Sequence, residues 1–185
     1  MRAAALAVLF MLMAHSASAQ LRPDPRKAEL DTLLNALKVA PNEEAAGAIE
    51  GRVKQLWLEA GSPAATLLMG RGLRDLANNA AGDAQDDFDA VLALEPELAE
   101  AYDRRAVARY LQGDYTGAII DIQATLQREP RSFMAFQGLS RIAEARGDLK
   151  GALVAWRRAL ELDPKSPGGD TRLRELVRKV EGERT

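Results

Sequence analysis

The chain has 185 residues, of which 47% are hydrophobic and 28% charged, and its formal net charge is −2. It contains no Cys and a single His, His15, which excludes disulfides, thiol nucleophiles and any metal site built mainly from Cys and His. The slightly acidic balance also argues against nucleic acid as a partner, because binding to phosphates requires a basic surface.

Residues 1–19 have the pattern of a cleavable signal peptide. Arg2 gives a positive start, residues 3–14 form an apolar run shorter than the ~20 residues of a spanning helix, and Ala17-x-Ala19 is a small-residue cleavage site. We expect cleavage after Ala19 and a periplasmic or secreted bacterial product that is not inserted in a membrane. The alternative is an uncleaved segment that anchors the protein. Cleavage would also remove His15, which leaves no His for Ser–His catalysis.

Residues 20–27 are expected to form an N-terminal linker, and residues 28–62 a pair of helices around Pro41. The first helix has an apolar stripe of Leu residues and the second has one that includes Trp57. The pair is interpreted as a degenerate hairpin that leads into the repeats described next.

A 34-residue period runs through the next hundred residues. The stretch GDYTGAIIDIQATLQREP, residues 113–130, returns as GDLKGALVAWRRALELDP at residues 147–164, and Pro96 closes an earlier copy. The three units are residues 65–98, 99–132 and 133–166. A sustained period of ~20 to ~50 residues is typical of arrays in which each unit buries its apolar face on its neighbours.

Each unit is predicted to be a hairpin of two antiparallel helices. Gly113 and Gly147 can adopt the left-handed conformation that ends a first helix, and the Asp after each can cap the second helix. The Pro that closes each unit disfavours helix at the residue before it. Small residues recur where the paired helices must approach closely, namely Gly72, Ala106 and Ser140 on the first helices and Ala84, Ala118 and Ala152 on the second.

Residues 167–185 are predicted to form a capping helix and a tail. Gly168 and Gly169 loosen the chain after Pro164, and a charged segment with one apolar stripe follows. Such a helix can shield the last repeat from water. With no strand-like alternation elsewhere, the chain is predicted to be one all-α domain.

The order of aromatic, small, Ala and Pro positions within each 34-residue unit resembles the tetratricopeptide-repeat (TPR) family. The third unit fits best, with Phe136, Ser140, Ala152, Trp156 and Pro164 in place. The resemblance implies a right-handed superhelical solenoid whose first helices line a concave groove that takes a peptide or another protein. The groove residues that it implies are Met69, Leu73, Asp103, Val107, Tyr110, Gln137, Arg141 and Glu144.

Two features limit this interpretation. The TPR subgroup that clamps a partner's C-terminal carboxylate needs polar residues where Met69, Leu73 and Gly138 stand, so an adaptor for chaperone tails is not expected. The apolar stripe that includes Met69 and Leu73 can equally be covered by the helix that carries Trp57. The sequence leaves that choice open.

The favoured function is a non-enzymatic scaffold or adaptor that binds protein or peptide partners and needs no cofactor or metal. The acidic run at residues 83–89 lacks calcium-loop spacing and is interpreted as a solvated helix face. One alternative is a membrane-anchored assembly factor that retains its N-terminal segment. The other is an enzyme that uses only carboxylates and Lys, although no convergent pair stands out.

Overall fold

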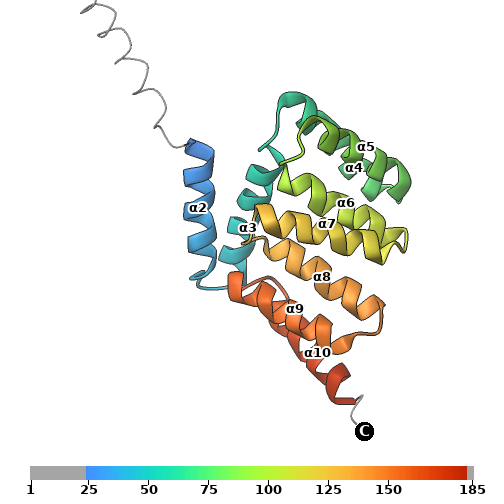
Figure 1. The fold of residues 1–185 in the computed structure, drawn as a ribbon. Helices are drawn as coiled ribbons and strands as arrows, with labels where there is room; N and C mark the ends of the chain where they lie inside the picture. The colour runs from blue at the N-terminus through green and yellow to red at the C-terminus, as the bar shows by residue number, and fades with distance from the viewer. Residues whose placement is uncertain (1–23, 183–185) are drawn as a thin grey trace, which may run out of the picture.

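The computed structural model describes residues 24–182, which fold into nine helices with no strand in that range (Figure 1). The expected signal peptide, residues 1–19, lies outside the described residues. The helices are α2 (Pro25–Leu37), α3 (Glu43–Leu58), α4 (Pro63–Ala77), α5 (Ala81–Leu94), α6 (Ala99–Leu111), α7 (Tyr115–Arg128), α8 (Phe133–Ala145), α9 (Leu149–Leu162) and α10 (Gly169–Gly182).

Helices α4 to α9 form three antiparallel hairpins that stack in chain order (Figure 1). Each helix packs on the one before and the one after it, and the first helices also contact each other, α4 with α6 and α6 with α8. The first helices therefore form one continuous layer of the stack. This is the all-α solenoid that the period predicted.

The helix ends follow the local signals in the sequence. Gly113 and Gly147 have φ of 81° and 79°, and Asn79 occupies the same turn of the first hairpin with φ of 60°. Asp114 accepts a hydrogen bond of 2.9 Å from the Gly117 N–H, and Asp148 caps α9 in the same way. The cap of α5 is Ala80, which has no side-chain oxygen to offer, so this helix start lacks the bond.

The paired helices touch at the recurring small residues. Ala84, Ala118 and Ala152 are completely buried. A Cβ atom on Gly72 would lie 2.6 Å from Cε1 of Phe88, closer than real Cβ contacts occur. The close approach of α4 and α5 therefore requires Gly at position 72.

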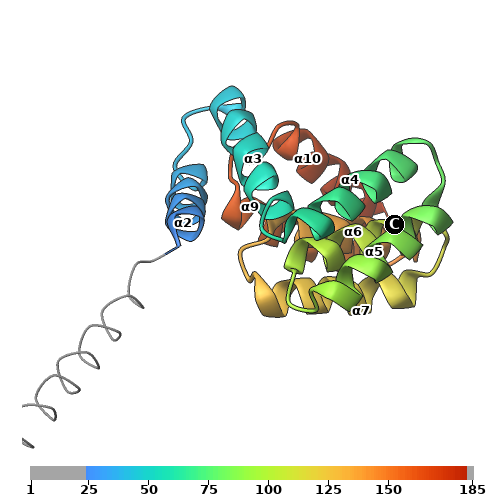
Figure 2. The ribbon, with the colours of Figure 1, turned by 90° about the horizontal axis from the view of Figure 1, so that it is seen from above.

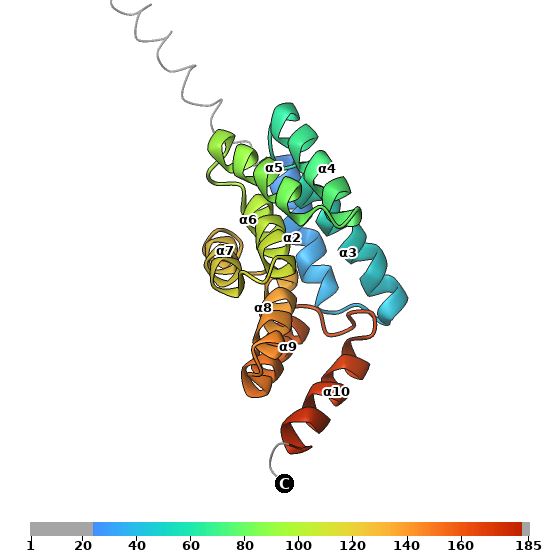
Figure 3. The ribbon, with the colours of Figure 1, turned by 90° about the vertical axis from the view of Figure 1, so that its right-hand side faces the viewer.

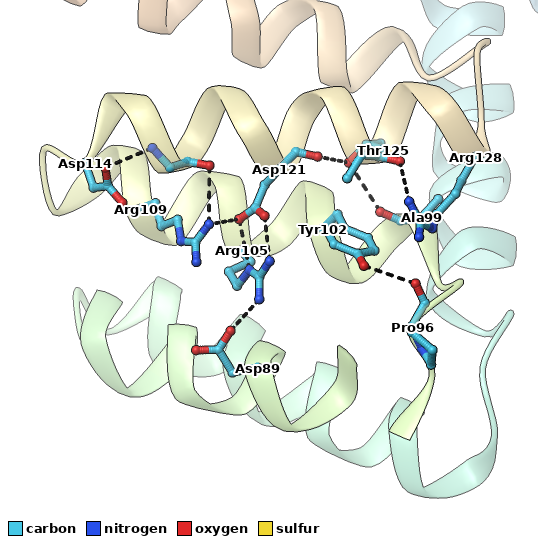
Figure 4. Close-up of polar contacts among 12 residues, drawn as sticks. Asp89, Pro96, Ala99, Tyr102, Arg105, Arg109, Asp114, Asp121, Thr125 and Arg128 are labelled. Atoms are coloured by element: carbon cyan, nitrogen blue, oxygen red, sulfur yellow. Dashed lines mark hydrogen bonds and ion pairs between the residues drawn. The ribbon is translucent and has the colours of Figure 1, made fainter. Parts of the chain in front are cut away.

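Charged side chains join the first and second hairpins across their shared face (Figure 4). Arg105 on α6 contacts Asp121 on α7 at 2.6 Å and Asp89 on α5 at 2.5 Å, and Arg109 contacts the same Asp121 at 2.9 Å. One repeat earlier, Arg71 donates to Asp87 at 2.6 Å. The pair recurs with the 34-residue period.

The third repeat does not keep this ion pair. The equivalent positions, 34 residues further on, hold Leu139 and Ala155, of which Leu139 is half-buried and Ala155 is buried. Two apolar residues therefore stand where the earlier repeats have the charged pair.

The leading hairpin forms as expected but packs in an unexpected place. Helix α2 begins at Pro25, inside the stretch expected to be linker, and pairs with α3 alongside the stack (Figures 1 and 3; seen from above in Figure 2). The ring of Trp57 lies 5.6 Å from that of Phe133, the first residue of α8. The buried side chains of α2 and α3 form one apolar cluster with Phe133 and Leu162 of the third repeat.

Polar contacts hold the leading hairpin to the third repeat and to the segments that flank it on either side. The hydroxyl of Ser166 donates to Glu50 at 3.3 Å, the N–H of Gly168 donates to Glu43 at 3.2 Å, and Arg131 pairs with Asp31 at 2.7 Å. Because α3 leads directly into α4, the hairpin connects the two ends of the array. It does not act as one more unit at its start.

Helix α10 lies at the end of the array opposite α4 (Figures 1 and 3). Its buried residues Leu176 and Val180 pack against Ala152 and Trp156 of α9. The indole N–H of Trp156 donates to the Gly169 carbonyl at 3.1 Å. The last repeat is thus covered on its outer side. In residues 24–182, no helix has the length and apolar character needed to cross a membrane.

Candidate functional site

A pocket of about 300 Å³ lies between the first helices of the second and third repeats, α6 and α8. Five of the eight predicted groove residues line it: Asp103, Val107, Tyr110, Gln137 and Arg141. Positions 103, 107 and 110 are spaced by four and three residues, so they share one face of α6. The pocket is the part of the predicted groove that the structure brings together.

The leading hairpin contributes one residue to this pocket. Lys54 of α3 lines it, and its ammonium lies 5.6 Å from the ring centroid of Phe133. No local pattern marks Lys54 as a site residue, because its position depends on α3 packing against a repeat about 80 residues away. Met134, Ile122 and Ile142 supply the apolar wall.

Two of the basic side chains in the pocket are already paired. Lys54 Nζ lies 2.5 Å from Glu50, and Arg104 lies 2.6 Å from Glu100. Burial raises the pKa of Glu100 to about 7, against the opposing effect of Arg104, and the neighbouring Asp103 adds to the shift. The amide of Gln137 donates to Ser166 at 3.4 Å.

Asp103 and Arg141 are not paired. Asp103 is only 5% exposed, yet among residues 24–182 its carboxylate has no hydrogen bond or ion pair. Burial raises its pKa, and the charges of Arg104 and Arg141 oppose the shift. Arg141 is exposed and likewise has no ion pair within the described chain. The pocket therefore presents one buried acceptor and one solvated donor to a ligand.

Tyr110 marks the far end of the pocket from Lys54 along α6. It is half-buried, and its ring centroid lies 5.8 Å from that of Tyr115. Since its ring rests on a second aromatic residue, Tyr110 offers a positioned apolar surface at the pocket.

The other three predicted residues lie outside the pocket. Glu144 is held by α10, where it pairs with Arg172 and, at 2.5 Å, with Lys179; these two hydrogen bonds lower its pKa. Leu73 is half-buried on α4. Met69 is completely buried in a cluster with Phe88, so its prediction as a partner contact is wrong.

The sequence left open that the helix carrying Trp57 covers Met69, but Trp57 itself does not pack there. The α3 residue that packs on the Met69 cluster is Leu58, whereas Trp57 packs on Phe133. Met69 is buried mainly because the second helix of its own hairpin and the start of α6 surround it, with Phe88 and Ala101 in the same cluster.

The described residues contain no group of three or more His, Cys, Asp or Glu side chains that could hold a metal ion. Within the acidic run of α5, Asp87 is paired with Arg71 and Asp89 with Arg105. These carboxylates serve the contacts between helices described above.

No family model matches the chain. A TPR repeat-containing protein of Rhizobium etli is 31% identical over 100 residues, which are 54% of this chain and 49% of that relative. The match thus spans about half the length of the relative.

Solved structures give the fold. The TPR2B domain of yeast Sti1, in a complex with pHsp70, has a TM-score of 0.59 and 19% identity, and covers 66% of this chain and 99% of its own. The Yersinia enterocolitica type III secretion chaperone SycD, with a peptide of the translocator YopD, has a TM-score of 0.61 and 17% identity, and covers 69% and 99%. In repeat period and in fold, the hairpins of this chain are therefore similar to tetratricopeptide repeats.

Proposed function

We propose that the chain is an exported, non-enzymatic binding module that holds a peptide segment of a partner protein across its second and third repeats. The observation that carries the proposal is the pocket between α6 and α8, which gathers five residues of the predicted groove. It is bordered by an aromatic side chain and an Arg, the residue types that most often carry interface energy. Two TPR structures similar in fold are complexes with pHsp70 and with a YopD peptide, which supports a polypeptide as the class of partner.

Site-specific photo-crosslinking tests the face that binds. A benzoylphenylalanine replaces Gln137, which is half-buried and lines the pocket, and the same residue at the exposed Gln123 of α7 serves as the control. After irradiation in the native cell envelope, we expect one set of adducts from position 137 that is missing from position 123. Adducts from position 123 alone would place the partner on the outer face of the array.

A double substitution tests the same pocket by loss of binding. Tyr110→Ala with Arg141→Ala should abolish recovery of the crosslinked partner at a temperature well below the helical melt. The lost packing of Tyr110 on Tyr115 should lower the melt, whereas the exposed Arg141 adds little to stability. The control pair is Gln123→Ala with Arg157→Ala, which are both exposed on second helices. Retained recovery in the first variant and loss in the second would contradict the groove assignment.

Export is the part of the proposal that rests on residues 1–19. N-terminal sequencing of the protein from its native cells is expected to give Gln20, in the periplasm or medium. A product that starts at Met1 in the membrane fraction would replace this proposal with an anchored assembly factor.

A further inference from the structure

Some charged side chains around the pocket form ion pairs within the protein, and others do not. Lys54 and Arg104 each lie within 2.6 Å of a Glu oxygen, and both of these Glu residues are buried. Their charges are therefore neutralised inside the protein. Of the charged side chains that line the pocket, Asp103 on α6 and Arg141 on α8 have no hydrogen bond or ion pair within residues 24–182.

These two unpaired charges are not equivalent. Arg141 is exposed, so water satisfies its guanidinium. Asp103 is 95% removed from solvent, since only 5% of its surface is exposed. A buried carboxylate is costly unless it is paired or hydrogen-bonded, and Asp103 is neither. The raised pKa of Asp103 reflects the same deficit.

We propose that the pocket receives a Lys or Arg side chain of the partner polypeptide, whose cationic head pairs with Asp103. This inference rests on the proposed function and names the chemistry of the partner. The alkyl stem of the incoming side chain lies against Val107, Ile122 and Ile142, which line the pocket. A pocket of about 300 Å³ is large enough for one long side chain and too small for a helix.

Arg141 then has a role at the mouth of the same pocket. Once the basic side chain is inserted, the adjacent backbone of the partner lies over the mouth of the pocket. A carbonyl or an acidic residue of that segment can accept hydrogen bonds from the Arg141 guanidinium, which is free to move. The favoured segment therefore has one basic residue with an acceptor next to it.

An acidic side chain fits the pocket less well. Lys54 and Arg104 are already held by Glu50 and Glu100, so an incoming carboxylate would gain Arg141 alone. It would also approach the carboxylate of Asp103, and the two negative charges would repel each other. A partner that inserts an acidic residue is thus the outcome that would contradict the proposal.

The test uses single-residue probes and the chain from Gln20, labelled with ¹⁵N. The probes are the Nα-acetyl methylamides of Lys, Arg, norleucine and Glu, each titrated while the backbone amide resonances of α6 and α8 are followed. We expect saturable shifts near Asp103 and Arg141 with the Lys and Arg probes. The norleucine probe, which has the stem without the charge, should bind about tenfold more weakly, and the Glu probe should bind no better than norleucine.

Matched variants locate the charge that is responsible. Asp103→Asn, which keeps the shape, should reduce affinity for the Lys probe about tenfold. Asp86→Asn makes the same change on the exposed face of α5, where the carboxylate has no ion pair within residues 24–182, and should leave that affinity unchanged. If Asp103→Asn fails to fold, the ranking of the four probes on the unchanged protein still decides.

The proposal is overturned if norleucine or Glu binds as well as Lys, if no probe shifts the pocket, or if Asp103→Asn binds Lys as tightly as before. These outcomes differ from failure of the proposed function. Crosslinks from position 137 that persist without any preference for a basic probe would keep the groove as the binding face and remove only the basic residue.

Discussion

The hydroxyl of Ser166 donates a 3.3 Å hydrogen bond to Glu50, which joins the end of the third repeat to a helix that precedes the first. Beside this bond lies Asp163, which is fully buried and whose two carboxylate oxygens have no hydrogen-bond partner among residues 24–182. Burial raises the pKa of Asp163 to about 7, and the nearby Glu50 carboxyl adds to the shift. A proton held between the two carboxyls would satisfy both.

Stability is expected to fall as the pH rises. In the unfolded chain Asp and Glu titrate near pH 4, whereas Asp163 and Glu100 titrate near pH 7 in the fold. Between these values the folded state binds more protons, so the free energy of unfolding decreases with pH across that window. Each group contributes about 2–3 kcal/mol over this window, so urea melts should show a loss on the order of 5 kcal/mol between pH 5 and pH 8.

Asp163→Asn should flatten this pH dependence. The amide cannot titrate and can donate to Glu50, so the variant is expected to be the more stable one at pH 8. Asp170→Asn, at an exposed carboxylate on α10, is the control and should leave the slope unchanged. An unaltered slope in Asp163→Asn would assign the pH dependence to other groups.

Replacing Arg105 should destabilise the fold more than replacing an exposed Arg. Arg105→Met leaves the buried Asp121 with Arg109 alone and is expected to cost about 2–3 kcal/mol. Arg158→Met removes an ion pair in which both side chains are more than half exposed, so little change is expected in chemical denaturation.

The third repeat suggests how the stability lost on replacing Arg105 can be recovered. Arg105→Leu with Asp121→Ala installs the residues that stand at positions 139 and 155. A double-mutant cycle should show that the pair of changes costs less than the sum of the two single ones. Additive losses would mean that the two side chains do not act as a unit.

Gly72 and Gly51 are predicted to respond oppositely to Ala. At Gly72 the new Cβ would meet the Phe88 ring at 2.6 Å, and overpacking of this kind costs about 1–3 kcal/mol. At Gly51, in the middle of α3, nothing lies within 4 Å, so Ala should stabilise the helix by about 0.5–1 kcal/mol. Thermal melts of the two variants should move in opposite directions.

The register of the hairpins is tested at the buried alanines. Ala118→Trp and Ala152→Trp place an indole where paired helices touch, and each should cost about 3 kcal/mol or more or prevent folding. Gln123→Trp, on the exposed side of α7, should have little effect. Similar denaturation midpoints for all three variants would show that the helix faces are misassigned.

Trp57→Ala tests where the leading hairpin packs. Because its ring lies against Phe133, hydrogen exchange is expected to increase at the start of α8, residues 133–137. Exchange at residues 65–69 of α4 should change less. An increase confined to α4 would favour the arrangement in which the hairpin precedes the first repeat.

The sequence predicts the repeats well because their signals are local. A Gly or Asn that ends a helix, such as Gly113, and an Asp that caps the next act within a few residues, and the period aligns their copies. The groove residues of α6 and α8 follow from the same register, which is why five of them meet in one pocket.

The misplaced elements depend on distant contacts. The apolar stripe of α3 shows that one face is buried but does not say which repeat covers it, so the contact of Trp57 with Phe133 could not be predicted. Met69 has the spacing of a groove residue, and only the packing of Phe88 and Ala101 around it reveals its burial. The isolation of Asp103 likewise depends on Arg104 turning to Glu100.

The contact between α3 and the third repeat also fixes the number of repeats. An open solenoid can gain or lose a unit with little disturbance, because each unit contacts only its neighbours. Here Trp57 must meet Phe133 across two intervening hairpins, and Glu50 must meet Ser166. Deleting or duplicating residues 99–132 would displace these partners from each other by one unit. Recombination between its own repeats therefore cannot change the length of this array without breaking these contacts.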